Sequence, residues 1–470
     1  MSQQTLILDR DNITKYQKEL HFPKNKSVPT RFSLDVEGRS QGFHIKEKLA
    51  QVPVKEGEVT YTASKKYDSL LKIEAHVNLI PIRVKEQYKK SVSIRYHHNL
   101  GHNILYFGEC KLDSDHYGYL DSTWLDIHAQ YFVKQRELYD KMVGNLSCLE
   151  GDGDEWPTEL PGLPLVVPQP YFFSRNSRVS LPILKSASNN ITFEYKIRTK
   201  LTDLIQMRVL TKEGVYKEIK CNLNYLDTKG YKHIPIPELW GRYAEMTEEE
   251  RNWRKSVNEE TGQPLKQVIY IEDIDITDSP NPTVIGTKEE IALGGSAPAK
   301  HIFWTASLVD GGHSNYTTNR YNLYQGWNPC VKSGIKYGTS FRVEEMEHQH
   351  FDLSEAYDFN WPNTPREAGY NVHTYTFNPI ELQSIDTAVI LKECGATLTV
   401  LLGDTNPYII PENEEEYYDE DGEVIPIEIL ETDDTKKDKY NLHIRTVVMR
   451  KLEVYWNDKS ESLKYVFTSV

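Results

Sequence analysis

Two histidines separated by one residue, His348 and His350, come closer than any others in this sequence to the spacing of a metal site. On a β-strand this spacing places both imidazoles on the same side, where neutral ring nitrogens can bind a transition metal. A metal would need a third and a fourth ligand, and the carboxylates of Glu344, Glu345 and Glu347 are close in sequence. An exposed polar loop would have the same composition without a metal, so we expect no metal site here.

The five cysteines indicate neither a disulfide framework nor a zinc site. They are odd in number, widely separated and never spaced as Cys-x-x-Cys. They are Cys110, Cys148, Cys221, Cys330 and Cys394. This usage favours a reducing compartment.

The remaining polar motifs are typical of ordinary surface or core residues. The glycine pairs at 294–295 and 311–312 lack the context of a phosphate-binding loop, and the histidines at 97, 98 and 102 have no known ligand spacing. Four asparagines fit the glycosylation pattern, but we expect no secretion signal: Asn12, Asn145, Asn190 and Asn315. No Gly-x-Ser-x-Gly motif occurs. We therefore predict that the chain is not an enzyme and has no catalytic, cofactor-binding or metal-binding residues.

Length and charge limit the function classes further. A chain of 470 residues is too long for one hydrophobic core and suggests two or three domains. Its net charge of -14 argues against direct binding of nucleic acid. Most of this charge lies in residues 412–438, where 13 acidic residues accompany 2 basic ones, so we expect a solvated loop. A calcium site is the alternative, although the segment lacks the fixed spacing of a calcium loop. We also expect no membrane-spanning segment.

Alternating apolar and polar residues predict β-strands in much of the chain. Residues 71–79 and 191–198 alternate clearly, which indicates strands with one buried face. The prolines in the apolar run 163–173 exclude a helix, so this run must be extended. A second set of strands is expected from about residue 265, and includes the apolar run 300–304. The pattern favours antiparallel sandwiches over strand-helix-strand units.

Few segments have helical periodicity. Asp121 can cap a short helix whose apolar stripe we expect to be buried: Trp124, Ile127, Tyr131 and Leu138. Residues 211–264 lack a clear core pattern, and we expect a connector or surface excursion there. Within it, Thr247 and Glu250 match a capping box for a polar helix.

Several short motifs occur along the chain in a distinctive order. They are Gly101-His102, His116-Tyr117-Gly118, Trp124-Leu125-Asp126-Ile127, the run 139–145, Phe172-Phe173-Ser174-Arg175-Asn176, Ser180-Leu181-Pro182-Ile183 and Gly395-Ala396-Thr397-Leu398. In this order they resemble the major capsid proteins of large nucleocytoplasmic DNA viruses, in which the first of these motifs belongs to a strand. The resemblance covers residues 30–205 and 265–470. Asp113-Ser114-Asp115 and Ser384-Ile385-Asp386 replace two glycine-containing turns of that family.

The resemblance implies an all-β fold, a double jelly roll of two antiparallel eight-stranded β-sandwiches with short helices in the loops. We expect an N-terminal arm at residues 1–27 and a first jelly roll at 28–210. The connector at 211–264 would follow, and then a second jelly roll at 265–470 that contains the acidic loop 412–438.

The resemblance also implies assembly rather than catalysis. Homotrimers would form pseudo-hexagonal capsomers that contact neighbouring capsomers and minor capsid proteins in an icosahedral virion capsid. This shell would enclose an internal viral membrane, with no cofactor and no direct contact with nucleic acid, and would assemble in the host cytoplasm or a virus factory. Two alternatives remain: a related trimeric scaffold or minor capsid protein, and a jelly-roll protein that binds a metal or sugar at His348 and His350.

Overall fold

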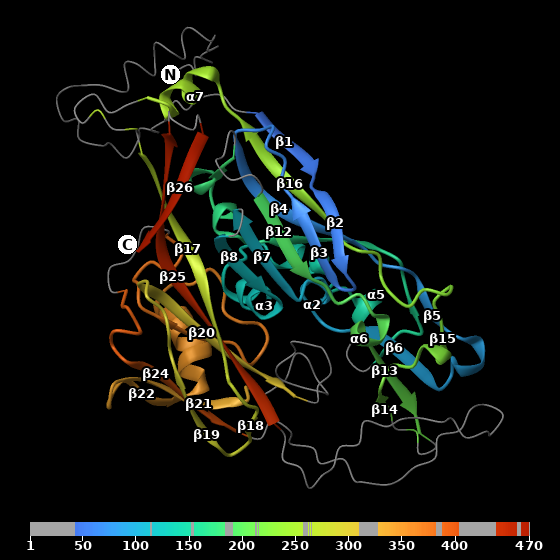
Figure 1. Cartoon of the computed structure of the whole chain (residues 1–470). Helices are drawn as coiled ribbons and strands as arrows, with labels where there is room; N and C mark the ends of the chain where they lie inside the picture. Colours follow the sequence, from blue (N-terminus) through green and yellow to red (C-terminus); the bar gives the residue numbers. More distant parts are fainter. Residues whose placement is uncertain are drawn as a thin grey trace, which may run out of the picture.

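The fold consists of two groups of antiparallel sheets that lie side by side (Figure 1). A computed structural model describes residues 43–469 except 113–114, 152–154, 184–190, 212–213, 215, 257–261, 263, 265, 310–327, 382–387, 404–438 and 458–461. The expected arm at 1–27 and the acidic loop at 412–438 lie outside the described residues. Described strands up to residue 245 pair with one another, as do those from residue 266 onward.

The first group contains two five-stranded sheets whose buried side chains share one core. One sheet has the order β1 (Phe43–Lys48), β16 (Glu238–Glu245), β4 (Ser69–Asn78), β10 (Pro164–Gln169), and β11 (Leu181–Pro182) also pairs with β4. The other has the order β2 (Ala50–Lys55), β3 (Glu58–Thr62), β12 (Ile191–Lys196), β7 (Phe107–Leu112), β8 (Asp115–Asp121).

Two small sheets extend this first group. They have the orders β14 (Tyr216–Ile219), β13 (Ile205–Leu210), β6 (Val92–Tyr96), and β15 (Leu226–Asp227), β5 (Ile82–Val84), β9 (Glu159–Leu160).

The alternating segments form strands as predicted. In β12, Ile191, Phe193 and Tyr195 are buried, while the polar residues between them are more exposed. β4 has the same alternation, and the proline-rich run forms the extended strand β10. A period of two matches a sheet that buries one face, which explains why the sequence predicted these strands well.

The segment expected to be a connector contains a strand of the first group. β16 lies between β1 and β4 and pairs with both. Leu239 and Tyr243 are completely buried, and Gly241 lies between them at a point where a Cβ would collide with the Tyr243 ring. This glycine weakens the alternating pattern in the sequence, so the strand was missed. The polar helix expected after Thr247 is present as α7 (Glu248–Arg254).

The second group contains a six-stranded and a four-stranded sheet. The first has the order β17 (Lys266–Asp278), β25 (Lys439–Asn457), β20 (Ala299–Leu308), β23 (Asn371–Thr374), and both β18 (Thr283–Val284) and β26 (Ser462–Ser469) also pair with β25. The second has the order β19 (Lys288–Ala292), β24 (Ala396–Leu402), β21 (Cys330–Tyr337), β22 (Ser340–Glu347).

Strand β20 of the six-stranded sheet is buried on both faces. Ile302 and Trp304 of β20 pack in the core that this sheet shares with the four-stranded sheet. Phe303, between them, packs in the core of the first group. Successive side chains of a strand point to opposite faces, so the apolar run at 302–304 indicates a strand between two cores.

Short helices connect the strands. They are α2 (Leu100–Ile104), α3 (Ser122–Tyr131), α4 (Arg136–Val143), α5 (Ser147–Glu150), α6 (Leu201–Leu204), α8 (Glu355–Asp358), η1 (Glu86–Tyr88), η2 (Phe172–Ser174), η3 (Ser177–Val179), η4 (Leu223–Tyr225) and the π-helical turn η5 (His350–Ser354).

Two expectations about helices require correction. Residues 100–104 form helix α2, not the strand that the capsid resemblance implied; Asn99 precedes it in the left-handed conformation, and the Asn103 side chain donates a hydrogen bond to the His98 carbonyl oxygen. The Asp121 side chain caps α3 as predicted, accepting a hydrogen bond from the Trp124 amide at 2.8 Å. The chain turns after α3, however, so Leu138 lies on α4 and is 57% exposed.

Candidate functional site

The contact between the two groups of sheets is the best candidate for a functional site, because it fixes how the two halves of the chain are arranged. Its centre is aromatic. Phe303 of β20 is completely buried, and its ring lies 5.0 to 5.9 Å from four other rings: Trp124, Tyr131, Phe132 and Trp361. Three of these rings belong to α3 or follow it directly. Edge-to-face and tilted contacts of this kind stabilise a packed interface beyond the area that they bury.

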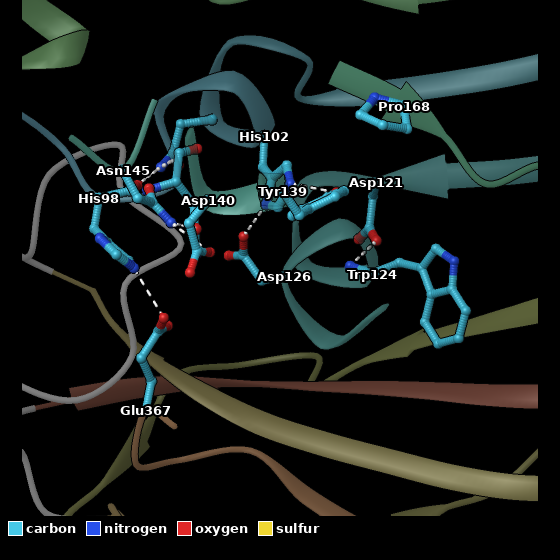
Figure 2. A network of polar contacts seen from close by, with 12 residues as sticks. His98, His102, Asp121, Trp124, Asp126, Tyr139, Asp140, Asn145, Pro168 and Glu367 are labelled. Atoms are coloured by element: carbon cyan, nitrogen blue, oxygen red, sulfur yellow. Dashed lines mark hydrogen bonds and ion pairs between the residues drawn. The ribbon is translucent and has the colours of Figure 1, made fainter. Parts of the chain in front are cut away.

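Beside this aromatic cluster, His98 bridges two carboxylates from different halves of the chain, and Figure 2 shows its contact with one of them, Glu367. Its Nε2 lies 2.9 Å from Oε1 of Glu367, which belongs to the second group, and its Nδ1 lies 3.0 Å from Oε1 of Glu150 in α5. All three side chains are at most 7% exposed. An ionised carboxylate only accepts hydrogen bonds, so both ring nitrogens of His98 must donate, which requires the charged imidazolium.

The electrostatics of this cluster agree with a charged His98. Burial alone would lower the pKa of His98, but the charges of Glu367 and Glu150 outweigh burial and raise this pKa well above its usual value. Burial alone would likewise raise the pKa of Glu367, but His98 and Arg136 lower it to about 2. Arg136 donates to Glu367 at 3.1 Å and to Asp140 at 2.6 Å. His98 and Glu367 are therefore both ionised at neutral pH.

A second buried histidine lies nearby in the first group. Nδ1 of His102 is 2.5 Å from Oδ1 of Asp126, and its Nε2 is 2.8 Å from the hydroxyl of Tyr139 (Figure 2). Burial raises the pKa of Asp126. His102 is completely buried, so the His–Asp pair cannot contact a substrate in solvent without opening of the core. We assign it to the packing of α2, α3 and α4.

Further ion pairs cross the contact. Arg445 of β25 is 1% exposed and contacts both Asp121, the cap of α3, and Asp278 at the end of β17. Arg175, which follows η2, pairs with Glu272 of β17 and donates to the carbonyl oxygen of Ile380 at 2.9 Å. Removing one partner of a buried ion pair leaves an uncompensated charge and lowers stability strongly, so these contacts hold the two groups of sheets in one arrangement.

His348 and His350, whose spacing would place both imidazoles on one side of a strand, do not lie on a strand. β22 ends at Glu347, and His348 begins a helical turn in which its Nδ1 lies 2.7 Å from Oδ2 of Asp352. His350 is 3.7 Å from Glu355, which also pairs with His373. Among the residues that the structure describes, no group of three or more His, Cys, Asp or Glu side chains is arranged to bind a metal.

The other residues named from the sequence are dispersed. All five cysteines are free, and Cys148 is the exposed one. Asn145 uses its side chain inside the fold, because its amide donates to Asn99 at 2.8 Å. The glycine pair at 311–312, Asn12, Asn190 and Asn315 lie outside the described residues. In the described part of the chain, no helix is long and apolar enough to cross a membrane.

No pattern in the sequence indicates the His98 cluster. His98 is 52 residues from Glu150 and 269 residues from Glu367, so no spacing rule connects them. Only covariation between these positions, or a structure, could show that His98 and the two carboxylates are in contact.

Comparison with known proteins identifies the relatives of this chain. No protein-family model matches it. The chain is 22% identical over 344 residues to the major capsid protein of Simulium iridescent virus, covering 69% of this chain and 70% of that protein. It is 24% identical over 346 residues to the major capsid protein of Heliothis virescens ascovirus 3e, covering 70% of this chain and 71% of that protein. The chain is a homologue of viral major capsid proteins. These homologues indicate a location in the virion capsid.

Solved structures show the fold independently. The Faustovirus major capsid protein superposes with a TM-score of 0.63 at 7% identity, over 90% of this chain and 92% of that one. A chain of the PBCV-1 virus capsid superposes with a TM-score of 0.62 at 13% identity, over 93% of this chain and 100% of that one. The predicted all-β double jelly roll is therefore confirmed.

Proposed function

We propose that this chain forms homotrimeric, pseudo-hexagonal capsomers that tile the outer shell of a large icosahedral DNA virus, and that it does not act as an enzyme. The observation that carries this proposal is the contact between the two halves. Each chain supplies two sandwiches joined by a buried aromatic and charged layer, so three chains in a ring would supply six similar units around one axis.

Exposed strand edges give a physical reason for assembly. Among the described strands, β2 lies at the edge of its sheet, and Val52 and Val54 on it are 59% and 64% exposed. β22 is an edge strand of the second group and exposes Phe341 and Met346. Exposed apolar edges favour association with other chains, and a capsomer lattice would cover such edges in a defined way.

The test is to measure the mass and outline of the purified full-length protein. We expect a particle with three times the 54.5 kDa mass of the chain, and a three-fold average with a six-sided outline in negative-stain electron microscopy. A monomer or a two-fold dimer across a range of protein concentrations would contradict the proposal.

A second measurement distinguishes a mature shell from a transient scaffold. We expect the chain to be a principal component of purified mature virions, at a copy number sufficient to cover the particle. Its presence only in immature particles would instead indicate a scaffold.

The acidic segment 412–438 provides a third test. We expect this segment to be a solvated loop on the outer surface of the capsomer, where like charges cost little. Deletion of residues 412–438 should leave the trimer intact. Loss of the trimer on deletion would indicate an interface element instead.

A further inference from the structure

The bridge at His98 differs from the aromatic and arginine contacts described above, because it depends on one titratable proton. An imidazolium donates from both ring nitrogens and can satisfy both Glu150 and Glu367, whereas a neutral imidazole donates from only one. After loss of the proton, one ring nitrogen would point its lone pair at a buried carboxylate.

The charged groups around His98 show that none of them can replace its charge. Arg136 of α4 contacts Glu367 and Asp140. Within the described residues, the ion pair of Glu150 is with His98. On the remaining side, Asp126 of α3 pairs with His102 of α2 and adds negative charge nearby. Neutral His98 would therefore leave the charge of Glu150 buried and unbalanced.

We propose that Glu150, His98 and Glu367 form a latch that holds the two groups of sheets together while His98 is protonated and loosens when alkaline pH removes the proton. This inference concerns the chain itself and does not depend on the proposed capsid function.

The sign of the pH effect follows from the two groups that differ most from their usual values. A raised pKa for His98 contributes stability that is complete at acidic pH and is lost as the pH rises through the value in the folded protein. The pKa of about 2 for Glu367 keeps this carboxylate charged in moderate acid. The pair between His98 and Glu367 therefore persists in moderate acid, and the latch responds to alkali.

The segment that carries Glu367 is positioned to report such an opening. The backbone amide of Arg366 donates to Oε1 of Gln130 at 3.0 Å, and the hydroxyl of Tyr131 donates to the Tyr370 carbonyl oxygen at 2.9 Å. Residues 361–370 thus lie against α3 through contacts on both sides of Glu367. If the latch loosens, the Arg366 amide loses its protection before the amides in the strands of either core do.

The test is hydrogen exchange of the purified full-length protein, read by mass spectrometry from about pH 6 to about pH 10 and corrected for the intrinsic rate. In the wild type, we expect exchange in residues 361–370 to rise about tenfold or more as His98 deprotonates, because each pKa unit of lost interaction is a factor of ten. Exchange in β24, which lies in the other sheet of the second group, should not rise with it.

Variants separate a titrating latch from a merely structural contact. Glu367→Gln should move the midpoint of the rise to lower pH, because His98 loses one of the two charges that raise its pKa. Glu150→Gln should do the same from the other side, which keeps the test available if one variant folds poorly. His128→Gln is the matched control: His128 is half-buried on α3, where it stacks on Phe132, but desolvation lowers its pKa to about 3, so it stays neutral throughout.

Three results would overturn the latch. The first is wild-type exchange in residues 361–370 that follows the intrinsic rate alone. The second is a midpoint that neither carboxylate variant moves. The third is a rise in β24 together with residues 361–370, which would indicate global unfolding in alkali rather than separation at one contact.

Discussion

Replacing Phe303 with alanine tests whether the aromatic layer holds the two halves of the chain together. The Phe303 side chain is completely buried and contacts rings from both halves, so its removal leaves a cavity that the rigid strand β20 cannot fill. Loss of a buried phenylalanine costs about 3 to 5 kcal/mol. Up to about 1.5 kcal/mol of this is the specific contact between rings, which Phe303→Leu would remove while it keeps most of the apolar volume.

Equilibrium unfolding in urea, or unfolding rates where refolding fails, would measure the cost for Phe303→Ala. Phe341→Ala is the matched control, because Phe341 lies on the edge strand β22 and is 42% exposed, so we expect a change within about 0.5 kcal/mol. Hydrogen exchange should also rise in α3 together with β20. A cost for Phe303→Ala below about 1 kcal/mol, or equal to that of the control, would refute the view that this layer joins the halves.

Three further predictions concern ionisable groups. In urea unfolding, Arg445→Met should destabilise the chain by about 3 to 5 kcal/mol, because the largely buried carboxylate of Asp121 loses its cation. Adding Asp121→Asn should recover part of this loss. If the double variant were no more stable than Arg445→Met, the ion pair would not explain the loss. Burial raises the pKa of Asp273 to about 6, so its contribution to stability is present below about pH 4 and lost as the pH rises through 6. At pH 7, Asp273→Asn should therefore be more stable than the wild type by up to about 3 kcal/mol and unfold at a higher temperature, whereas at pH 4 it should show no gain. If the stability of the variant and of the wild type depended on pH in the same way, the prediction would be wrong. With a thiol reagent, Cys148 should react first, and Cys110 only after unfolding, because burial shields this thiol and raises its pKa; early labelling of Cys110 would contradict the packing.

Local patterns in the sequence were sufficient to predict the strands that bury one face. β4 and β12 alternate with a period of two, and their buried faces are those that the alternation indicated. The cap of α3 was equally predictable, because it depends on two residues close in sequence: the Asp121 side chain accepts a hydrogen bond from the Trp124 amide three residues later. Such features depend on neighbours in sequence, so a single sequence contains them.

Features set by packing were not predictable in this way. Helix α2 consists of residues that are all buried, so no polar face marks its period. β16 is central although it contains Gly241, which is tolerated because the ring of Tyr243 fills the space beside it. The His98 cluster joins residues 269 positions apart. In each case the deciding contact comes from another part of the chain.

The two-sided burial of β20 links the fold to the proposed assembly. A sheet that served only its own sandwich would leave Phe303 exposed to solvent, where an apolar strand face invites aggregation. Here that face is covered within the same chain, by α3 and the residues after it. The surfaces left for contacts with other chains include edge strands such as β2, where Val52 and Val54 are exposed. Edge contacts can be repeated around a ring without rearranging either core, so each chain can enter an assembly as a preformed pair of sandwiches.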